Sequence, residues 1–153
     1  MPEAEASRAA VSVRRASIRY VETSALLAAL LEQEPEAKRS LRSQGLRVTS
    51  ALTVAEAQRA IVRARVSGRL TQAQERAVAR ALRTFLLRCD LVAVTDDVLT
   101  RAGRPFPVEP VRTLDAIHLA TVELLGEPPA LLTVVTRDAR VRSNAAALGY
   151  PTA

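Results

Sequence analysis

The sequence predicts an α/β domain built around a mainly parallel sheet. Short segments rich in β-branched residues alternate along the chain with longer segments that have the apolar period of a helix. The chain has 153 residues, of which 48% are hydrophobic and 25% charged, and this suits one domain with its own core. No repeat or inter-domain linker is visible. We therefore expect residues 1–16 to be a flexible leader and residues 17–153 to form a single domain.

Four segments are typical of β-strands. Residues 18–21 are β-branched and aromatic, and residues 131–136 form an almost continuous apolar run between turn signals. Such a run indicates a central strand that is buried on both faces. The expected strands are 18–21, 46–50, 91–94 and 131–136.

Helices are predicted between these strands from capping residues, prolines and glycines. Ser24 is the expected N-cap of the first helix, and Pro35 can begin the second. Capping boxes are expected at Thr53–Glu56 and Thr71–Gln74. Residues 104–110 hold three prolines and should form a loop. The expected helices are 23–33, 35–43, 53–68, 71–86, 96–103, 113–125 and 138–148.

The charge of the chain is basic. The net charge is +6, and Lys38 is the only lysine among 22 basic residues. Residues 1–16 contribute little of this excess, so most of it lies on the predicted domain. A basic surface favours phosphate polyanions such as nucleic acids. Because a biased genomic base composition would also enrich arginine, charge alone leaves nucleic-acid binding open.

The sequence carries no signal for secretion or for the membrane. The single cysteine, Cys89, has no partner for a disulfide or a Cys-type zinc site, which fits a reducing cytoplasm. No apolar run approaches the roughly 18 residues of a membrane-spanning helix. Residues 1–16 also lack the apolar core of a signal peptide. We therefore expect a cytoplasmic protein without membrane contact.

Four acidic residues lie where expected strands end or expected helices begin. Glu22 follows the first strand, and Asp138 follows the last. Glu56 lies in the expected first turn of the third helix, and Asp115 opens the helix after the proline loop. These points gather at one edge of an open parallel sheet, so the carboxylates are expected to converge. Because clustered carboxylates need a cation to remain ionised, the pattern indicates a site for Mg²⁺ or Mn²⁺.

The same acids also suit helix starts on structural grounds alone. Glu56 completes an expected capping box, and Asp138 can serve as an N-cap. Asp115 and Glu22 would be stabilised by the positive end of a helix. For any one of these acids a structural role is the simpler interpretation. The functional interpretation therefore depends on their joint placement and on the residues around them.

Segments around these acids resemble the motifs of one family. Tyr20–Leu26 resembles the opening motif of PIN domains, and Arg112–Ala120 closely resembles the third-acid segment of VapC-type toxins. Thr136–Arg140 and the later Ala147–Tyr150 resemble the fourth-acid segment and closing helix of these toxins. Thr53–Glu56 matches the second-acid region by position. The resemblance extends over nearly the whole predicted domain.

The resemblance implies a three-layer α/β/α sandwich and an endoribonuclease that depends on Mg²⁺ or Mn²⁺. It also implies the toxin of a type II toxin–antitoxin pair, with RNA as substrate, a homodimer as assembly and a cognate antitoxin whose tail blocks the acidic pocket. The implied catalytic acids are Glu22, Glu56, Asp115 and Asp138. The implied metal ligands are Glu22, Asp115 and Asp138. The implied supporting hydroxyls are those of Thr23, Ser24 and Thr136.

Two features depart from the family pattern. The first acid of the family is usually Asp, whereas Glu22 has an extra methylene and an extra rotatable bond. This change could weaken a magnesium site, which demands near-ideal geometry, or could favour manganese. The alternative function is therefore a catalytically weakened or inactive PIN module that binds RNA or a protein partner. The family also usually ends in one more strand, which is expected here to be short or missing before Ala153.

Other residues near the acids allow more than one role. Arg112, Arg137 and Arg140 could contact RNA phosphates, although Arg112 could instead pair with Asp115 and the other two could lie on a solvated helix face. His118 is expected to pack or to form hydrogen bonds rather than to bind metal. Because the chain has only two Tyr, two Phe and no Trp, RNA is expected to be read by backbone and shape rather than by base stacking.

Rival enzyme classes lack their required residues. A receiver-type signalling domain needs a lysine late in the chain, and the only lysine is Lys38. A phosphatase of the haloacid dehalogenase kind needs Asp-x-Asp after the first strand, where this sequence has Glu22-Thr23-Ser24. No Gly-rich phosphate-binding loop is present, which disfavours nucleotide hydrolysis.

Overall fold

The computed structural model describes residues 17–153, and the expected leader at residues 1–16 lies outside the described residues. The strands are β1 (Ile18–Val21), β2 (Leu46–Ser50), β3 (Asp90–Val92) and β4 (Leu132–Val135). The helices are α1 (Thr23–Leu30), α2 (Pro35–Arg42), α3 (Ala51–Val66), α4 (Gln72–Leu86), α5 (Asp96–Ala102), α6 (Thr113–Leu124) and α7 (Ala139–Ala147), with a 3-10 turn η1 (Pro129–Leu131).

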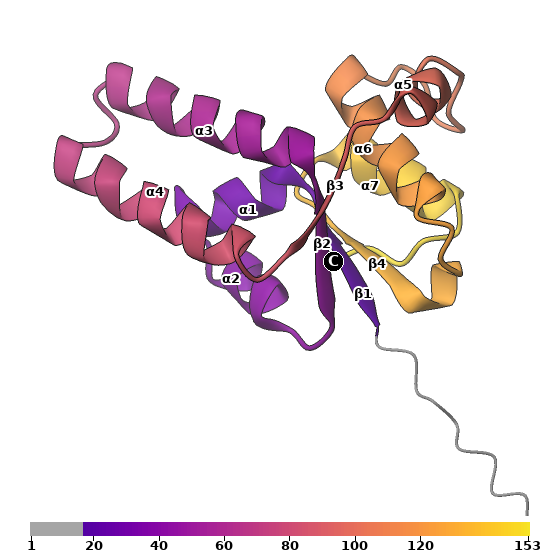
Figure 1. Ribbon diagram of the computed structural model, residues 1–153, viewed down its shortest axis with the longest axis horizontal. Helices are drawn as coiled ribbons and strands as arrows, with labels where there is room; N and C mark the ends of the chain where they lie inside the picture. Colours follow the sequence, from indigo (N-terminus) through magenta and orange to yellow (C-terminus); the bar gives the residue numbers. More distant parts are fainter. Residues whose placement is uncertain (1–16) are drawn as a thin grey trace, which may run out of the picture.

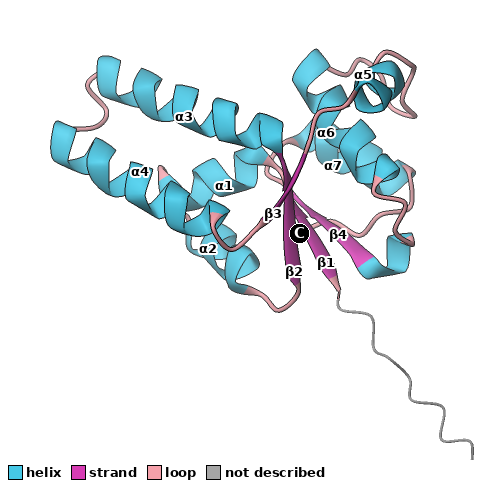
Figure 2. Ribbon diagram, in the orientation of Figure 1, coloured by secondary structure: helices cyan, strands magenta, loops and turns pink. Residues whose placement is uncertain are grey.

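The four strands form a parallel sheet in the order β3-β2-β1-β4. Figure 1 shows α1 to α4 on one face of the sheet and α5 to α7 on the other. The predicted α/β class and the expected three-layer arrangement are therefore confirmed (Figure 2). Strands β2 and β3 follow one another on one side of β1, whereas β4 lies on the other side of β1. The crevice between β1 and β4 therefore lies at a topological switch point. Ligands of open parallel sheets usually bind at such points, outside the carboxyl ends of the strands.

Alternating side chains of each strand supply the cores on the two faces of the sheet. Tyr20 and Val134 belong to the cluster beneath α6 and α7. Their neighbours Val21 and Val135 belong to the cluster beneath α1, α3 and α4. Successive side chains of a strand point to opposite faces, which explains this division. Burial on both faces anchors the carboxyl ends of β1 and β4, where Glu22 and Thr136 follow.

One predicted N-cap residue and one predicted helix start were wrong. Ser24 does not cap α1, because Glu22 occupies the N-cap position and its side chain accepts a hydrogen bond from the backbone N–H of Ser24. The predicted box at Thr53–Glu56 also does not form. Helix α3 begins at Ala51, and the hydroxyl of Ser50 caps it by accepting from the N–H of Leu52. Glu56 consequently lies in the second turn of α3 rather than the first.

Other boundaries agree with the sequence more closely. The capping box at Thr71 and Gln74 is confirmed, with both reciprocal hydrogen bonds present. The prediction of a short final strand is also confirmed. The backbone N–H of Val134 donates to Pro151, and the N–H of Thr136 donates to Ala153, so residues after α7 extend the sheet beside β4. Among residues 17–153, no helix has both the length and the apolar character needed to cross a membrane.

Candidate acidic active site

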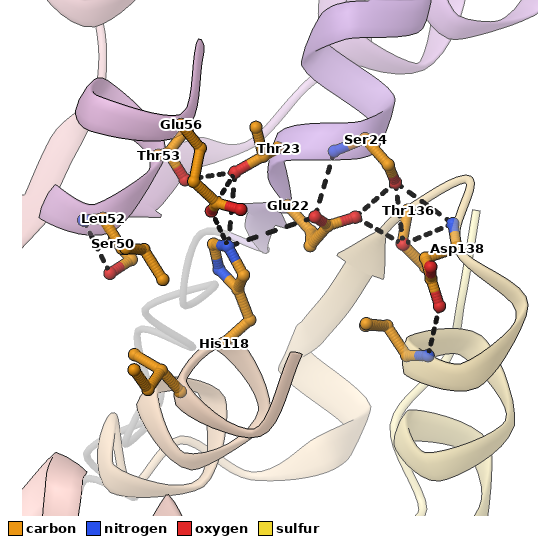
Figure 3. Close-up of polar contacts among 12 residues, drawn as sticks. Glu22, Thr23, Ser24, Ser50, Leu52, Thr53, Glu56, His118, Thr136 and Asp138 are labelled. Atoms are coloured by element: carbon orange, nitrogen blue, oxygen red, sulfur yellow. Dashed lines mark hydrogen bonds and ion pairs between the residues drawn. The ribbon is translucent and has the colours of Figure 1, made fainter. Parts of the chain in front are cut away.

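The predicted site residues lie around the carboxyl ends of β1 and β4. Glu22, Thr23 and Ser24 follow β1, while Thr136 and Asp138 follow β4. Figure 3 shows Glu22 between two polar groups, with His118 and Glu56 on one side and Ser24, Thr136 and Asp138 on the other. Asp115 lies in the first turn of α6, on the opposite face of the sheet from α1. The fold therefore brings side chains from distant parts of the chain to one edge.

Glu22 is buried, with 4% of its surface exposed, and both of its carboxylate oxygens accept hydrogen bonds. Oε1 accepts from the backbone N–H of Ser24 at 3.0 Å. Oε2 accepts from the Thr136 hydroxyl at 2.7 Å and forms a very short hydrogen bond with the Ser24 hydroxyl. The longer side chain of Glu allows one carboxylate to reach both neighbouring segments. Glu22 thus caps α1 and joins it to the end of β4.

The Ser24 hydroxyl continues this connection toward Asp138. Its oxygen accepts from the backbone N–H of Arg137 at 2.8 Å and from that of Asp138 at 3.1 Å. Asp138 in turn caps α7, because its Oδ1 accepts from the N–H groups of Arg140 and Val141 at 2.8 and 3.1 Å. The predicted N-cap role of Asp138 is therefore confirmed. One carboxylate oxygen of Asp138 anchors the helix, which fixes the direction of the other.

Asp115 has a different environment. Its Oδ2 atom is buried and has no hydrogen-bond partner among residues 17–153. Burial raises the pKa of the Asp115 carboxyl, and the negative charges of Asp138 and Glu22 raise it further, whereas Arg112 and His118 oppose the shift. Asp138 and Glu22 are therefore near enough for their charges to act on Asp115. An unpartnered buried oxygen at this point is costly unless a further group satisfies it.

A buried imidazole joins the remaining predicted acid to the site. Nε2 of His118 lies 2.7 Å from Oε1 of Glu56 and 4.0 Å from Oε1 of Glu22. The Thr23 hydroxyl also donates to Oε1 of Glu56, at 2.8 Å. Burial alone would raise the pKa of Glu56, but the hydrogen bond and charge of His118, with help from Thr23 and Arg63, lower it below its ordinary value. Glu56 is thereby held in its ionised form.

Sequence reasoning missed some of the polar residues that support these acids. It expected His118 to pack or form hydrogen bonds, which is confirmed, but it did not identify Glu56 as the partner. It also missed Thr49 and Thr53, whose buried hydroxyls link Thr23 to β2. Because His118 lies one helical turn after Asp115, its spacing in the sequence indicated that it lies near the site. Buried threonines carry no comparable signal in a single sequence.

The three predicted phosphate-binding arginines have different surroundings. The Nε atom of Arg137 donates to both carboxylate oxygens of Glu34 at 3.1 Å, so this side chain is held in an ion pair. Arg112 is exposed at the start of α6, and its charge acts on Asp115. Arg140 is exposed in the first turn of α7. Arg112 and Arg140 are therefore more accessible to a ligand than Arg137 is.

Comparison with known proteins assigns the chain to a family. The family model of the PIN domain matches residues 19–147. The chain belongs to the PIN-domain family. The ribonuclease VapC46 of Mycobacterium tuberculosis is 40% identical over 133 residues, covering 85% of this chain and 92% of that protein.

Solved structures agree with this fold assignment. The PIN domain of this chain is similar to the structure of VapC20 from Mycobacterium tuberculosis, described as a sarcin-ricin loop cleaving toxin, with a TM-score of 0.62, 19% identity and coverage of 86% and 95% of the two chains. It is also similar to a chain of a toxin–antitoxin complex from Klebsiella pneumoniae, with a TM-score of 0.57, 21% identity and coverage of 86% and 92%. At these identities the likeness concerns the fold.

The oxygen donors of this PIN domain suit a divalent cation bound partly through water. Within residues 17–153, no three His, Cys, Asp or Glu side chains are grouped so that they could hold one metal ion directly. Magnesium, however, commonly keeps several waters and binds only one or two carboxylates. The unpartnered Oδ2 of Asp115, with Asp138 and Glu22 near enough to raise the Asp115 pKa, provides such a donor set. The residues present therefore fit the metal that the family implies.

Proposed function

We propose that this PIN domain is an endoribonuclease of the VapC type, the toxin component of a type II toxin–antitoxin pair, and that it depends on Mg²⁺ or Mn²⁺. The observation that carries the proposal is the buried, unpartnered oxygen of Asp115 beside two further carboxylates. The 40% identity to a protein named as a ribonuclease supports it. The positive net charge of +6 is also suited to a polyanionic substrate.

In this proposal Asp115, Asp138 and Glu22 would hold the metal together, with water between the metal and at least one of them. A divalent cation there would lower the pKa of water and neutralise developing charge on a phosphodiester. The hydroxyls of Ser24 and Thr136 keep Glu22 in place by hydrogen bonds to Oε2. That arrangement removes the need for Glu22 to reorganise when a substrate binds.

Glu56 would have a separate role beside the metal ligands. Both of its side-chain hydrogen bonds within the described residues go to Oε1, from His118 and Thr23. The carboxylate is ionised because His118 keeps its pKa low, so Oε2 can accept a proton from the attacking water or orient that water. The two hydrogen bonds to Oε1 fix the position of the carboxylate and leave Oε2 free of partners among the described residues.

The proposed function also defines the expected partners. The substrate is RNA, and a cognate antitoxin would block the acidic pocket with a basic tail, since opposite charge favours such an insertion. Several structural relatives are toxin–antitoxin complexes, which supports an antitoxin partner. We further propose a homodimer that acts in the cytoplasm.

A cleavage assay tests this function. Total RNA is incubated with the purified chain in Mg²⁺, in Mn²⁺ or in chelator, and the products are mapped. We expect discrete fragments with metal and none with chelator. Asp115→Ala should abolish cleavage, whereas Asp97→Asn, which removes an exposed acid in α5, should leave it intact. Undiminished cutting by Asp115→Ala would refute the assignment of the site.

A catalytically weak PIN module is the second candidate function. The observation in its favour is that hydrogen bonds from Ser24 and Thr136 occupy both oxygens of Glu22. Such a module would bind RNA or a protein partner without cutting. The two candidates predict different changes in cleavage for Glu22→Asp, which are given in the Discussion.

A further inference from the structure

A hollow lined by Glu56, Thr23 and Leu114 adjoins the acidic centre. It lies between α1 and α3, which run side by side (Figure 1), and has a volume of about 340 Å³. Its walls combine apolar side chains with one acid and two guanidinium groups. The residues that define it are Leu27, Leu52, Leu114, Glu56, Arg59 and Arg63.

The two arginines of this hollow are available to a ligand. Arg59 and Arg63 follow Glu56 on the same side of α3, at spacings of three and seven residues. Both are exposed, and neither forms an ion pair with any residue in 17–153. They differ in this respect from Arg137, which is paired with Glu34. Four residues of helix separate them by roughly 6 Å along the axis, a spacing that suits two successive phosphates of one strand.

The hollow continues along the helix pair. A second cavity of about 280 Å³ shares Leu27 and Arg63 with the first and reaches Ser67 and Arg69, just beyond the end of α3. The two cavities together form what we call the α1–α3 groove. It extends from Glu56 to Arg69, and its lining holds three arginines, Arg59, Arg63 and Arg69, and one further acid, Glu32.

We propose that the α1–α3 groove binds the RNA strand on one side of the scissile phosphate. Arg59 and Arg63 contact successive phosphates, and Leu27, Leu52 and Leu114 contact a ribose or base. This inference rests on the proposed ribonuclease function and adds the path of the substrate. An RNA strand is favoured over an acidic protein segment because the groove opens directly at Glu56, where the substrate must pass. The apolar walls lack aromatic side chains, so this contact tolerates different bases.

The test measures RNA binding apart from cleavage. A fluorescent single-stranded RNA that contains a site mapped in the total-RNA assay is titrated with the full chain carrying Asp115→Asn, over a range of salt concentrations. In that background Arg59→Gln with Arg63→Gln removes the two groove charges. Arg76→Gln with Arg80→Gln removes the same charge from the exposed face of α4 and is the matched control.

We expect the groove variant to bind the RNA at least tenfold more weakly than the control. Each lost phosphate contact should also reduce the slope of log K against log salt by about 0.7, or about 1.4 for two. In the cleaving chain the same two substitutions should raise KM about tenfold. Arg59→Gln alone, which keeps the charge of Arg63 near Glu56, should raise KM with little change in kcat. Circular dichroism should be unchanged, since both arginines are exposed.

Three results would overturn the inference. If the two double variants bind the RNA with equal affinity and equal salt slopes, the RNA does not lie in the groove. The proposed ribonuclease function would be unaffected by that result. If the groove variant binds an antitoxin more weakly than the control but binds RNA equally well, the groove is a protein-docking surface instead. If the unsubstituted chain neither cuts nor binds RNA, both the groove and the proposed function fail.

Discussion

Nε2 of His118 lies 2.7 Å from Oε1 of Glu56, so an imidazole from α6 holds a carboxylate from α3 across the carboxyl end of the sheet. On the other side of the ring, the hydroxyl of Tyr20 lies 2.7 Å from Nδ1. Burial, with the nearby charge of Glu22, raises the pKa of Tyr20, so its hydroxyl stays protonated and can donate to Nδ1. Tyr20 and Glu56 therefore hold the His118 ring at both of its nitrogens.

Replacing this imidazole should affect both stability and cleavage. His118 is 1% exposed, and His118→Ala would leave a cavity and remove the partner of Tyr20. We expect the free energy of unfolding to fall by about 2–4 kcal/mol, measured by urea denaturation. We expect kcat to fall at least tenfold because Glu56 loses its support. Tyr20→Phe, which keeps the ring, should cost only about 1–2 kcal/mol. An unchanged kcat in His118→Ala would contradict the role assigned to Glu56.

Neutralising Asp115 should stabilise the metal-free protein. The pKa of Asp115 is raised above its ordinary value of 3.8 in the folded chain, so ionisation opposes folding. Its contribution to stability is present below the unfolded pKa and is lost as the pH rises through the folded pKa. In chelator at pH 7, Asp115→Asn should therefore raise the Tm by roughly 2 °C. The gain should vanish near pH 3, and Asp97→Asn should show neither effect. A lower Tm for Asp115→Asn at pH 7 would mean that the carboxylate is satisfied in solution.

Asn144 should be necessary for the loop that leads to Arg112 and Asp115. Its buried side chain accepts from the N–H of Val108 at 2.9 Å and donates to the carbonyl oxygens of Val108 and Arg140 at 2.9 and 3.1 Å. Asn144→Ala would leave these backbone groups unpaired, and we expect a loss of about 2–3 kcal/mol in urea denaturation. Asn144→Asp should reduce the free energy of unfolding further, because a carboxylate would face two carbonyl oxygens. A loss below about 0.5 kcal/mol for both variants would show that the loop does not need this anchor.

Glu22→Asp separates the two candidate functions. Asp can still cap α1, but its shorter side chain reaches less far toward Thr136, so we expect at most about 1 kcal/mol of destabilisation in denaturant titrations. Because an acid remains beside Asp115, cleavage should change less than tenfold in a metal-dependent assay. A hundredfold gain would instead identify the natural chain as a weakened module. Glu22→Gln, which keeps the length and removes the charge, is the control and should lose cleavage.

The sequence predicted the fold and the joint position of Glu22, Asp115 and Asp138 better than it predicted individual contacts. The fold follows from alternating strands and helices, and convergence of the acids follows from a parallel sheet, whose strand ends share one edge. The predicted start of α3 was wrong because two possible N-caps, Ser50 and Thr53, lie three residues apart. Ser50 caps the helix, whereas the Thr53 hydroxyl is buried and bonded to that of Thr49. The pairing of His118 with Glu56 spans 62 positions, and no local pattern specifies it.

The capping role of Glu22 also affects how an acidic residue at this position should be interpreted. Its carboxylate fixes the first turn of α1 and joins that helix to the segment after β4. A related protein that no longer cut RNA would still lose stability if it lost this carboxylate. The persistence of an acid here would therefore be poor proof of retained catalysis. Asp115 opposes folding in the absence of metal, so its persistence in descendants would be the more informative sign of selection for activity.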